Sequence, residues 1–159
     1  MNKKPLTIDC QDGIYYYVEQ PQMQVEVILA SRNAELPDEK PLYTVRMRYP
    51  RPIHGEIMTH RVFGRNARSS RAVPVKTMLL ECTSTPFVPW HWGKNQKGMQ
   101  ANEECNAPVE FKSPKGMVMH SQSRKGAWLM ARDRAVEVAG AMMEAGYHKQ
   151  IPNRLLEPF

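Results

Sequence analysis

The feature that most constrains this sequence is an arginine-rich stretch near its middle. Residues 59–71 contain four arginines, a histidine, two serines and an asparagine, and no acid. From Arg46 to Arg71 there are seven arginines and no lysine, against the single acid Glu56. Side chains that can nearly all donate hydrogen bonds suit phosphate oxygens, and a planar guanidinium can grip an oxyanion through two bonds. We therefore expect this stretch to bind an anionic group.

A solvated basic face or a nucleic-acid patch is the alternative interpretation, and for charge runs in general it is the commoner outcome. Here, however, apolar residues are mixed with the charges: Ile53, Ile57, Met58, Val62 and Phe63. This mixing favours a partly buried site over a free basic tail.

Composition indicates one globular domain over residues 1–159. Hydrophobic residues make up 42% of the chain and charged residues 24%, which is the range of folded proteins. The net charge of +6 favours anionic partners, which include nucleotides, phosphorylated cofactors, nucleic acid and acidic membrane surfaces. No stretch is long and apolar enough to predict a membrane span.

The three cysteines, Cys10, Cys82 and Cys105, are far apart and odd in number, and no CxxC pair occurs. This pattern argues against a zinc site and against a disulfide framework, and it fits a reducing cytoplasm. Each cysteine is predicted to be a small buried hydrophobe, and no metal is expected.

The first half of the chain predicts strands and one short helix. Residues 1–22 are interpreted as an entry arm with a short edge strand at residues 15–18. Alternating, β-branched residues predict strands at 24–30 and 42–49. A helix is expected from near Ile53 to Gly64, with a core-facing stripe and with Glu56 and His60 on another face. A binding loop should follow, up to Pro74.

The second half predicts more helix, so the expected class is α+β. A short helix is expected over residues 75–81, with Met78 and Leu79 inward, and a hairpin within residues 109–119. The longest helix should open near Ser123 and end at Gly146, and a final short helix should start near Tyr147. Between the helix at 75–81 and the hairpin lie two tryptophans, Trp90 and Trp92, on either side of His91. They either stack on a flat ligand or plug a long loop onto the core, and we favour the second interpretation.

The central stretch resembles the signature of flavin-dependent thymidylate synthases. That signature is Arg-His-Arg, seven residues, then Ser, with an Asn in the gap and an Arg two past the Ser. Here it reads Thr59-His60-Arg61, residues 62–68, then Ser69, with Asn66 and Arg71 in place. Thr-His-Arg and the following Pro74 are typical of a bacterial and phage branch. Residues 91–100 and 148–159 resemble that branch's second and third blocks, whereas residues 106–122 look like an insertion.

The resemblance implies an enzyme, a methyltransferase that converts dUMP to dTMP in the cytoplasm. Its cofactor would be FAD, its carbon donor methylenetetrahydrofolate and its reductant NADPH. The implied fold is a small, mainly antiparallel sheet packed with helices, as in the thymidylate synthase complementing proteins. By position, the implied FAD-binding residues are His60, Arg61, Val62 and Asn66. The implied dUMP-binding residues are Glu56, Ser69, Ser70, Arg71 and Arg154, the last reaching a neighbouring subunit's site in a homotetramer.

Family members continue well beyond Pro158, so the resemblance implies that this chain corresponds to an N-terminal portion of the fold. A complementary C-terminal fragment is therefore a second expected partner. On this basis the chain alone is expected to bind FAD weakly and not to make dTMP.

Two alternatives stay open. One is a non-catalytic protein that keeps nucleotide affinity on the same scaffold. The other is a basic nucleic-acid-binding module that uses its arginines together with Trp90 and Trp92, which we regard as the weaker interpretation. Salt distinguishes them, because binding to many phosphates weakens steeply as counterions are released.

Overall fold

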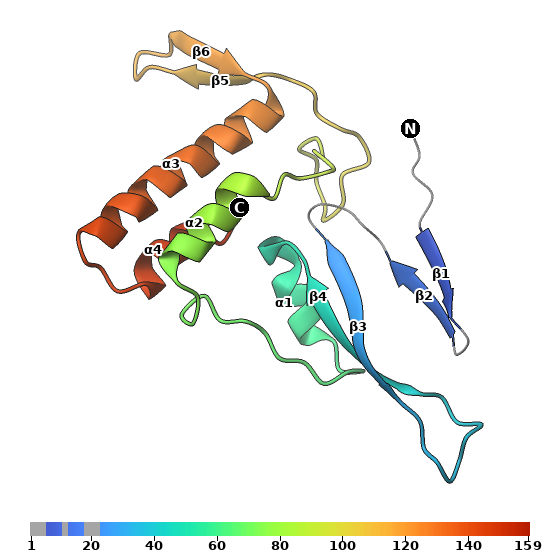
Figure 1. Cartoon of the computed structure of the whole chain (residues 1–159). Coiled ribbons are helices and arrows are strands. Elements are labelled where there is room, and N and C mark those ends of the chain that lie inside the picture. Colours follow the sequence, from blue (N-terminus) through green and yellow to red (C-terminus); the bar gives the residue numbers. More distant parts are fainter. Residues whose placement is uncertain (1–5, 11–12, 18–22) are drawn as a thin grey trace. The chain divides into compact units, whose positions relative to one another are not determined.

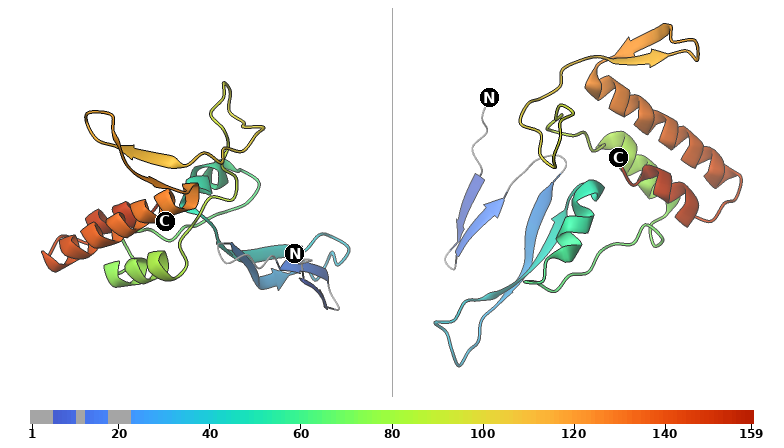
Figure 2. Two further views of the ribbon diagram at one scale, coloured as in Figure 1. Left: turned by 90° about the horizontal axis from the view of Figure 1, so that it is seen from above. Right: turned by 180° about the vertical axis from the view of Figure 1, so that it is seen from behind.

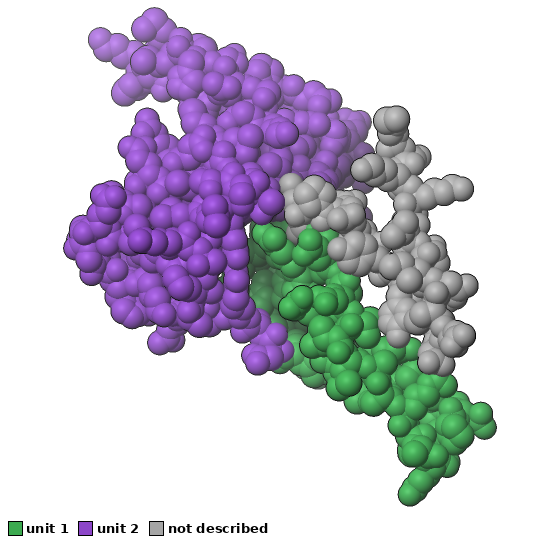
Figure 3. Space-filling view, in the orientation of Figure 1, with its two compact units in different colours: residues 1–65 green, residues 66–159 purple. Residues whose placement is uncertain are grey.

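The computed structural model describes residues 6–10, 13–17 and 23–159, and its class is α+β, as predicted (Figure 1). The described strands form three separate two-stranded antiparallel sheets, whereas one small sheet was expected. The chain divides into two compact units, residues 1–65 and residues 66–159 (Figure 3). The single domain expected from composition stays a prediction.

Unit 1 begins with a hairpin that the sequence analysis missed. Strand β1 (Leu6–Cys10) pairs with β2 (Gly13–Tyr17), so the entry arm expected over residues 1–22 is structured in these two segments. The predicted edge strand overlaps β2 at Tyr15–Tyr17, and Val18 lies outside the described residues. Polar residues among the β-formers hid β1 from a test for alternation.

The second hairpin of unit 1 matches the predicted strands. β3 (Gln24–Ser31) pairs with β4 (Leu42–Arg48), with Val25 opposite Met47, Val27 opposite Val45, and a register shift after Val27. Directly opposed residues share a face of a sheet. One face is therefore apolar, and its members are Val25, Val27, Tyr43, Val45 and Met47, which we call the apolar hairpin face. On the other face, Arg46 pairs with Glu26.

The helical part of unit 1 is shorter than predicted. A 3-10 turn, η1 (Arg51–Ile53), leads into α1 (His54–Thr59), and His60 already has an extended backbone with ψ of 132°. The helix was expected to reach Gly64. The Thr59 hydroxyl donates to the carbonyl of Glu56 at 2.7 Å, a local bond that competes with continued helix.

This early end breaks up the predicted helix faces. His60 follows the helix, so it does not share a helical face with Glu56. Val62 is 94% exposed, so the expected core-facing stripe is not formed. A helix of six residues has few internal hydrogen bonds and depends on tertiary packing to extend.

Unit 2 is built on three helices that pack against one another: α2 (Val75–Ser84), α3 (Arg124–Glu144) and α4 (Gln150–Leu156) (Figures 1 and 2). Their shared core is formed by buried Cys82, Ala139 and Leu156. Met78 and Leu79 pack against that core, as predicted.

The ends of α3 agree with the sequence. The Ser123 hydroxyl accepts from the backbone N–H of Gly126 at 3.0 Å, which caps the start of the helix. Gly146 has a φ of +83° just after the last turn, a conformation that favours glycine. Helix α4 begins at Gln150, later than Tyr147, whose N–H still donates to the carbonyl of Met142 at 3.0 Å and so closes the end of α3.

Before α3, β5 (Val109–Lys112) and β6 (Val118–Gln122) form the predicted hairpin. Its turn has Ser113 N–H donating to the carbonyl of Met117 at 2.8 Å, and Gly116 with a φ of +83°. Among the helices described, none combines the length and apolarity that a bilayer crossing requires.

Candidate anion-binding loop

The loop of residues 66–74 leads directly into α2, and a tight turn shapes its centre. The carbonyl of Ser69 accepts from the N–H of Ala72 at 3.0 Å. The Ser69 hydroxyl accepts from the N–H of Arg71 at 3.2 Å. Serine favours such local bonds to the backbone, which explains a turn at this point of the chain. Ser69, Ser70 and Arg71, three predicted substrate-binding residues, are thus held on one turn.

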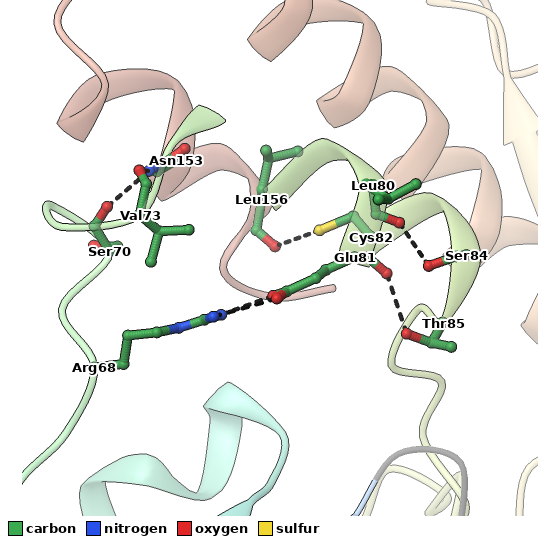
Figure 4. Close-up of polar contacts among 10 residues, drawn as sticks. All are labelled: Arg68, Ser70, Val73, Leu80, Glu81, Cys82, Ser84, Thr85, Asn153 and Leu156. Atoms are coloured by element: carbon green, nitrogen blue, oxygen red, sulfur yellow. Dashed lines mark hydrogen bonds and ion pairs between the residues drawn. The ribbon is translucent and has the colours of Figure 1, made fainter. Parts of the chain in front are cut away.

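A buried asparagine of α4 fastens this loop (Figure 4). The side-chain amide of Asn153 donates to the carbonyl of Ser70 at 2.7 Å and to the carbonyl of Val73 at 2.9 Å. Asn153 is 0% exposed. Its other polar atom, Oδ1, is also buried and has no hydrogen-bond partner among the described residues. A donor pair of this kind holds two carbonyls of one loop at a single point.

Of the arginines on this loop, Arg68 is already neutralised. Its guanidinium donates to both carboxylate oxygens of Glu81, at 3.2 and 2.7 Å (Figure 4). This hydrogen bonding raises the pKa of Arg68 above its ordinary value, against the opposing effect of partial burial. Arg68 therefore ties the loop to α2, and it is not free for another anion.

Arg71 and Arg154 differ from Arg68 in that no acid among the described residues pairs with them. Both are exposed, and neither side chain has an ion pair or hydrogen bond to the residues that the structure describes. Arg71 follows Ser70, and Arg154 follows Asn153, so the two arginines flank the hydrogen bond that joins their neighbours. The backbones of residues 71 and 154 therefore lie near each other in one chain, and the expectation that Arg154 serves a neighbouring subunit's site stays a prediction.

Four of the other predicted site residues, Glu56, His60, Arg61 and Val62, lie in unit 1. Glu56 is exposed in the first turn of α1. The His60 ring stacks on Phe63 with centroids 5.8 Å apart and planes at 27°. Arg65 donates to the carbonyls of His60 and Phe63, which holds this turn, while Arg61 and Val62 are exposed.

Asn66 is exposed at the first position of unit 2. The partly buried site predicted from the mixture of apolar and basic residues is therefore wrong for residues 61–69, all of which are exposed. The cause is local, since the helix that should have carried their apolar side chains ends at Thr59. Grouping of Glu56, His60, Arg61 and Val62 with the loop residues stays a prediction.

The tryptophan block mainly serves packing. Trp92 and Phe87 each contact Trp128 edge to face, with centroids 6.2 and 6.1 Å apart. The Trp128 indole N–H donates to the carbonyl of Phe87 at 2.7 Å. The favoured interpretation, that the pair plugs the loop onto the core, is confirmed for half-buried Trp92. Trp90 also contacts Phe87 but is 53% exposed.

An ionic cluster closes the same block. Glu104 accepts from the backbone N–H of Trp92 at 3.3 Å and from Arg124 at 3.2 Å, and its Oε1 lies 3.5 Å from His91 Nδ1. The backbone hydrogen bond, with the charge of Arg124, lowers the pKa of Glu104. These contacts account for His91 as part of a structural cluster. In the described part of the chain, no three His, Cys, Asp or Glu side chains gather in a way that suits a metal ion.

Asn153 was not predicted as a functional residue, although it lies in the motif block of residues 148–159. One signal was available. Asparagine is a poor helix former, and here it lies inside a helix between Pro152 and Leu156, both of which are buried. A buried asparagine in such a place needs partners outside its own helix.

In the comparison with known proteins, no family model, no curated protein and no solved structure matches this chain.

Proposed function

We propose that this chain binds dUMP and belongs functionally with the flavin-dependent thymidylate synthases, which methylate dUMP to dTMP. One observation carries the proposal: the fastened turn of residues 69–71 displays Arg71, whose charge no described residue neutralises. The resemblance of residues 59–71 to the family signature also supports the proposal.

The chemistry of the turn suits a phosphate monoester. Arg71 offers a planar pair of donors, and Arg154 of a neighbouring subunit, as the resemblance implies, offers a second cation. The hydroxyls of Ser69 and Ser70 can each donate one more hydrogen bond. Two guanidinium groups match the charge of close to −2 that a nucleoside monophosphate carries at neutral pH, by analogy with phosphorylated side chains.

In the proposal, the side chains that the resemblance assigns to FAD have chemistry that suits a flavin nucleotide. His60 and Val62 offer a flat ring and an exposed apolar side chain to an isoalloxazine, and Arg61 offers a cation to a diphosphate. Asn66 adds amide hydrogen bonds. Bound FAD, once reduced by NADPH, would supply the hydride in this chemistry, and methylenetetrahydrofolate would donate the carbon. In the proposal the chain's own residues orient the ligands, and Glu56 lines the dUMP pocket in a site formed between subunits of a homotetramer.

Calorimetric titration with two matched ligands tests this proposal. dUMP and 2′-deoxyuridine differ only in the phosphate, so we expect dUMP to bind more tightly than deoxyuridine. A salt series should weaken dUMP binding gently, because a single phosphate is bound. If an oligonucleotide binds more tightly than dUMP, and its affinity falls steeply and regularly as salt is raised, nucleic-acid binding is supported instead. Equal affinity for dUMP and deoxyuridine would overturn the proposal.

FAD binding and turnover form the second stage. Quenching of flavin fluorescence on addition of the protein would show the cofactor site. Tritium release from labelled dUMP, with FAD, NADPH and methylenetetrahydrofolate, measures the reaction, for the chain alone and with a C-terminal family fragment. Tight dUMP binding without tritium release in either case would point to the non-catalytic nucleotide-binding alternative.

A further inference from the structure

The contacts of Asn153 do more than satisfy a buried side chain. Both bonds are donations from one amide nitrogen to carbonyls of the same loop, at 2.7 and 2.9 Å, across 83 and 80 residues of sequence. An amide NH₂ has two hydrogens, so its donor capacity is fully used. Oδ1 is left buried without a partner among the described residues, which costs stability. Asn153 thus holds this loop while its own acceptor oxygen stays without a hydrogen bond.

The two anchored carbonyls decide which way the loop residues face. Val73 is buried and Ser70 is half-buried, and these are the two anchored positions. Arg71 and Ala72 lie between the anchors, and both are exposed. The turn bond from Ala72 N–H to the carbonyl of Ser69, at 3.0 Å, shortens this segment further. A segment pinned at both ends with a tight turn between them has few backbone conformations left for Arg71.

We infer that Asn153 is a positioning residue for phosphate recognition: it pins the loop at Ser70 and Val73 so that Arg71 faces the phosphate of a nucleoside monophosphate. The inference rests on the proposed function for its ligand. A site that binds an anion tightly needs its donors held in place before the ligand arrives, because ordering a loop on binding costs affinity. Asn153 meets that need from inside the core, where no ligand touches it.

A purely structural Asn153 is the competing explanation. In that case its bonds would stabilise the packing of α4 on the loop, and a variant would lower stability without a specific effect on the ligand. The two explanations differ in one measurable ratio, the affinity for dUMP divided by that for 2′-deoxyuridine. Only loss of the phosphate contact changes this ratio.

The test uses Asn153→Ala in the full chain, with Leu156→Val as the matched control. Leu156 lies on the same helix and is 0% exposed, but its side chain packs in the helical core. Asn153→Ala should lower dUMP affinity about 10-fold to 100-fold, the scale for a displaced contact group, and leave deoxyuridine affinity unchanged. Leu156→Val should lower stability and keep the dUMP-to-deoxyuridine ratio. Asn153→Ser, which keeps one donor, gives an intermediate ratio and serves if the alanine variant does not fold.

Amide hydrogen exchange of residues 69–74 supplies a readout that needs no ligand. We expect faster exchange at Ala72 in Asn153→Ala, with α3 unchanged. A ratio that falls equally in Leu156→Val, or that stays at the wild-type value in both Asn153 variants, would overturn the inference. If wild-type protein itself does not prefer dUMP over deoxyuridine, the proposed function fails, and the phosphate role of Asn153 fails with it. Unchanged exchange at Ala72 would, in addition, overturn the pinning of the loop.

Discussion

Arginine side chains in this chain differ in how much of their charge is already neutralised. Arg68 is paired with Glu81, Arg124 with Glu104 and Arg134 with Glu137. Arg71 and Arg154 have no such partner in the part of the chain that the structure describes. The density of arginines in the sequence therefore overstates the number of cations available to a ligand. On the loop of residues 66–74, which holds two arginines, pairing takes up Arg68 and leaves Arg71.

Replacing Arg71 tests this selection. Arg71→Ala should weaken dUMP binding by about 1.5–3 kcal/mol, the range for a hydrogen bond to a charged group. Arg71→Lys should restore only part of the loss, because lysine lacks the planar fork. Arg134→Ala is the matched control, since Arg134 is exposed on α3 and bonded to Glu137. Calorimetry that finds the same dUMP affinity in all three variants would remove Arg71 from the site.

Cys82 has an environment that opposes ionisation. It is buried in the helical core, and its thiol donates to the carbonyl of Leu156 at 3.4 Å. Burial, with a smaller effect from the charge of Glu81 and against that of Arg132, raises the pKa of the Cys82 thiol to about 11. A thiol held neutral in this way is a poor nucleophile, which agrees with the prediction that Cys82 is a buried packing residue. Cys105 is only half-buried, and the side chain of Cys10 lies outside the described part of the chain.

The raised pKa has a consequence for stability at high pH. The folded thiol keeps its proton above the pH at which the unfolded thiol loses it, so the folded state binds more protons in this window. The stabilising contribution is complete below about pH 9 and is lost as pH rises through about 11, by about 2 to 3 kcal/mol. Urea unfolding of wild type and Cys82→Ala should therefore give a difference in unfolding free energy that shrinks over this range. A constant difference from pH 8 to pH 11 would contradict it.

Among the elements, those with several agreeing local signals were predictable. Helix α3 has a capping serine at its start and a terminal glycine with φ of +83°, and its expected bounds hold. Helix α1 had only apolar spacing, and it ends at Thr59, well before Gly64. Spacing alone does not predict helix length, because it takes no account of whether a partner surface exists to bury the stripe.

The cap of α3 can be tested directly. Ser123→Ala removes the acceptor for the Gly126 N–H and should lower the unfolding free energy by about 1 kcal/mol. Ser121→Ala is the matched control, because Ser121 is exposed on β6 before the helix begins. Equal stability of the two variants in chemical unfolding would show that the hydroxyl of Ser123 contributes nothing as a cap.

At the scale of the whole molecule, contacts between residues far apart in the chain could not be predicted from the sequence. Ser69, Ser70 and Arg71 were found because they are neighbours within one motif. The contact that fastens them joins Asn153 and Ser70 across 83 residues, and no local pattern encodes that pair. Which arginines remain unpaired depends in the same way on Glu81, which lies 13 residues beyond Arg68. Local chemistry thus indicated the kind of ligand, and tertiary contacts decide which side chains are left to bind it.

The apolar hairpin face of unit 1 bears on the predicted homotetramer. Val25, Tyr43, Val45 and Met47 on this face are 38%, 44%, 41% and 39% exposed. An isolated two-stranded hairpin is marginally stable in water, and contiguous exposed apolar side chains mark association surfaces. We therefore expect the protein to self-associate through this face.

Sedimentation velocity over a range of concentrations measures this association. The double substitution of Val25→Thr and Val45→Thr keeps side-chain shape and β propensity but makes the face polar, so the weight-average mass should shift toward that of the monomer. Thr44→Ser, a change next to Val45 in the chain but on the other face, should leave the mass unchanged. Circular dichroism checks that all three proteins keep the same secondary structure. A wild-type protein that is monomeric at every concentration would contradict the expected oligomer, and an oligomer that survives the double substitution would place its interface elsewhere on the molecule.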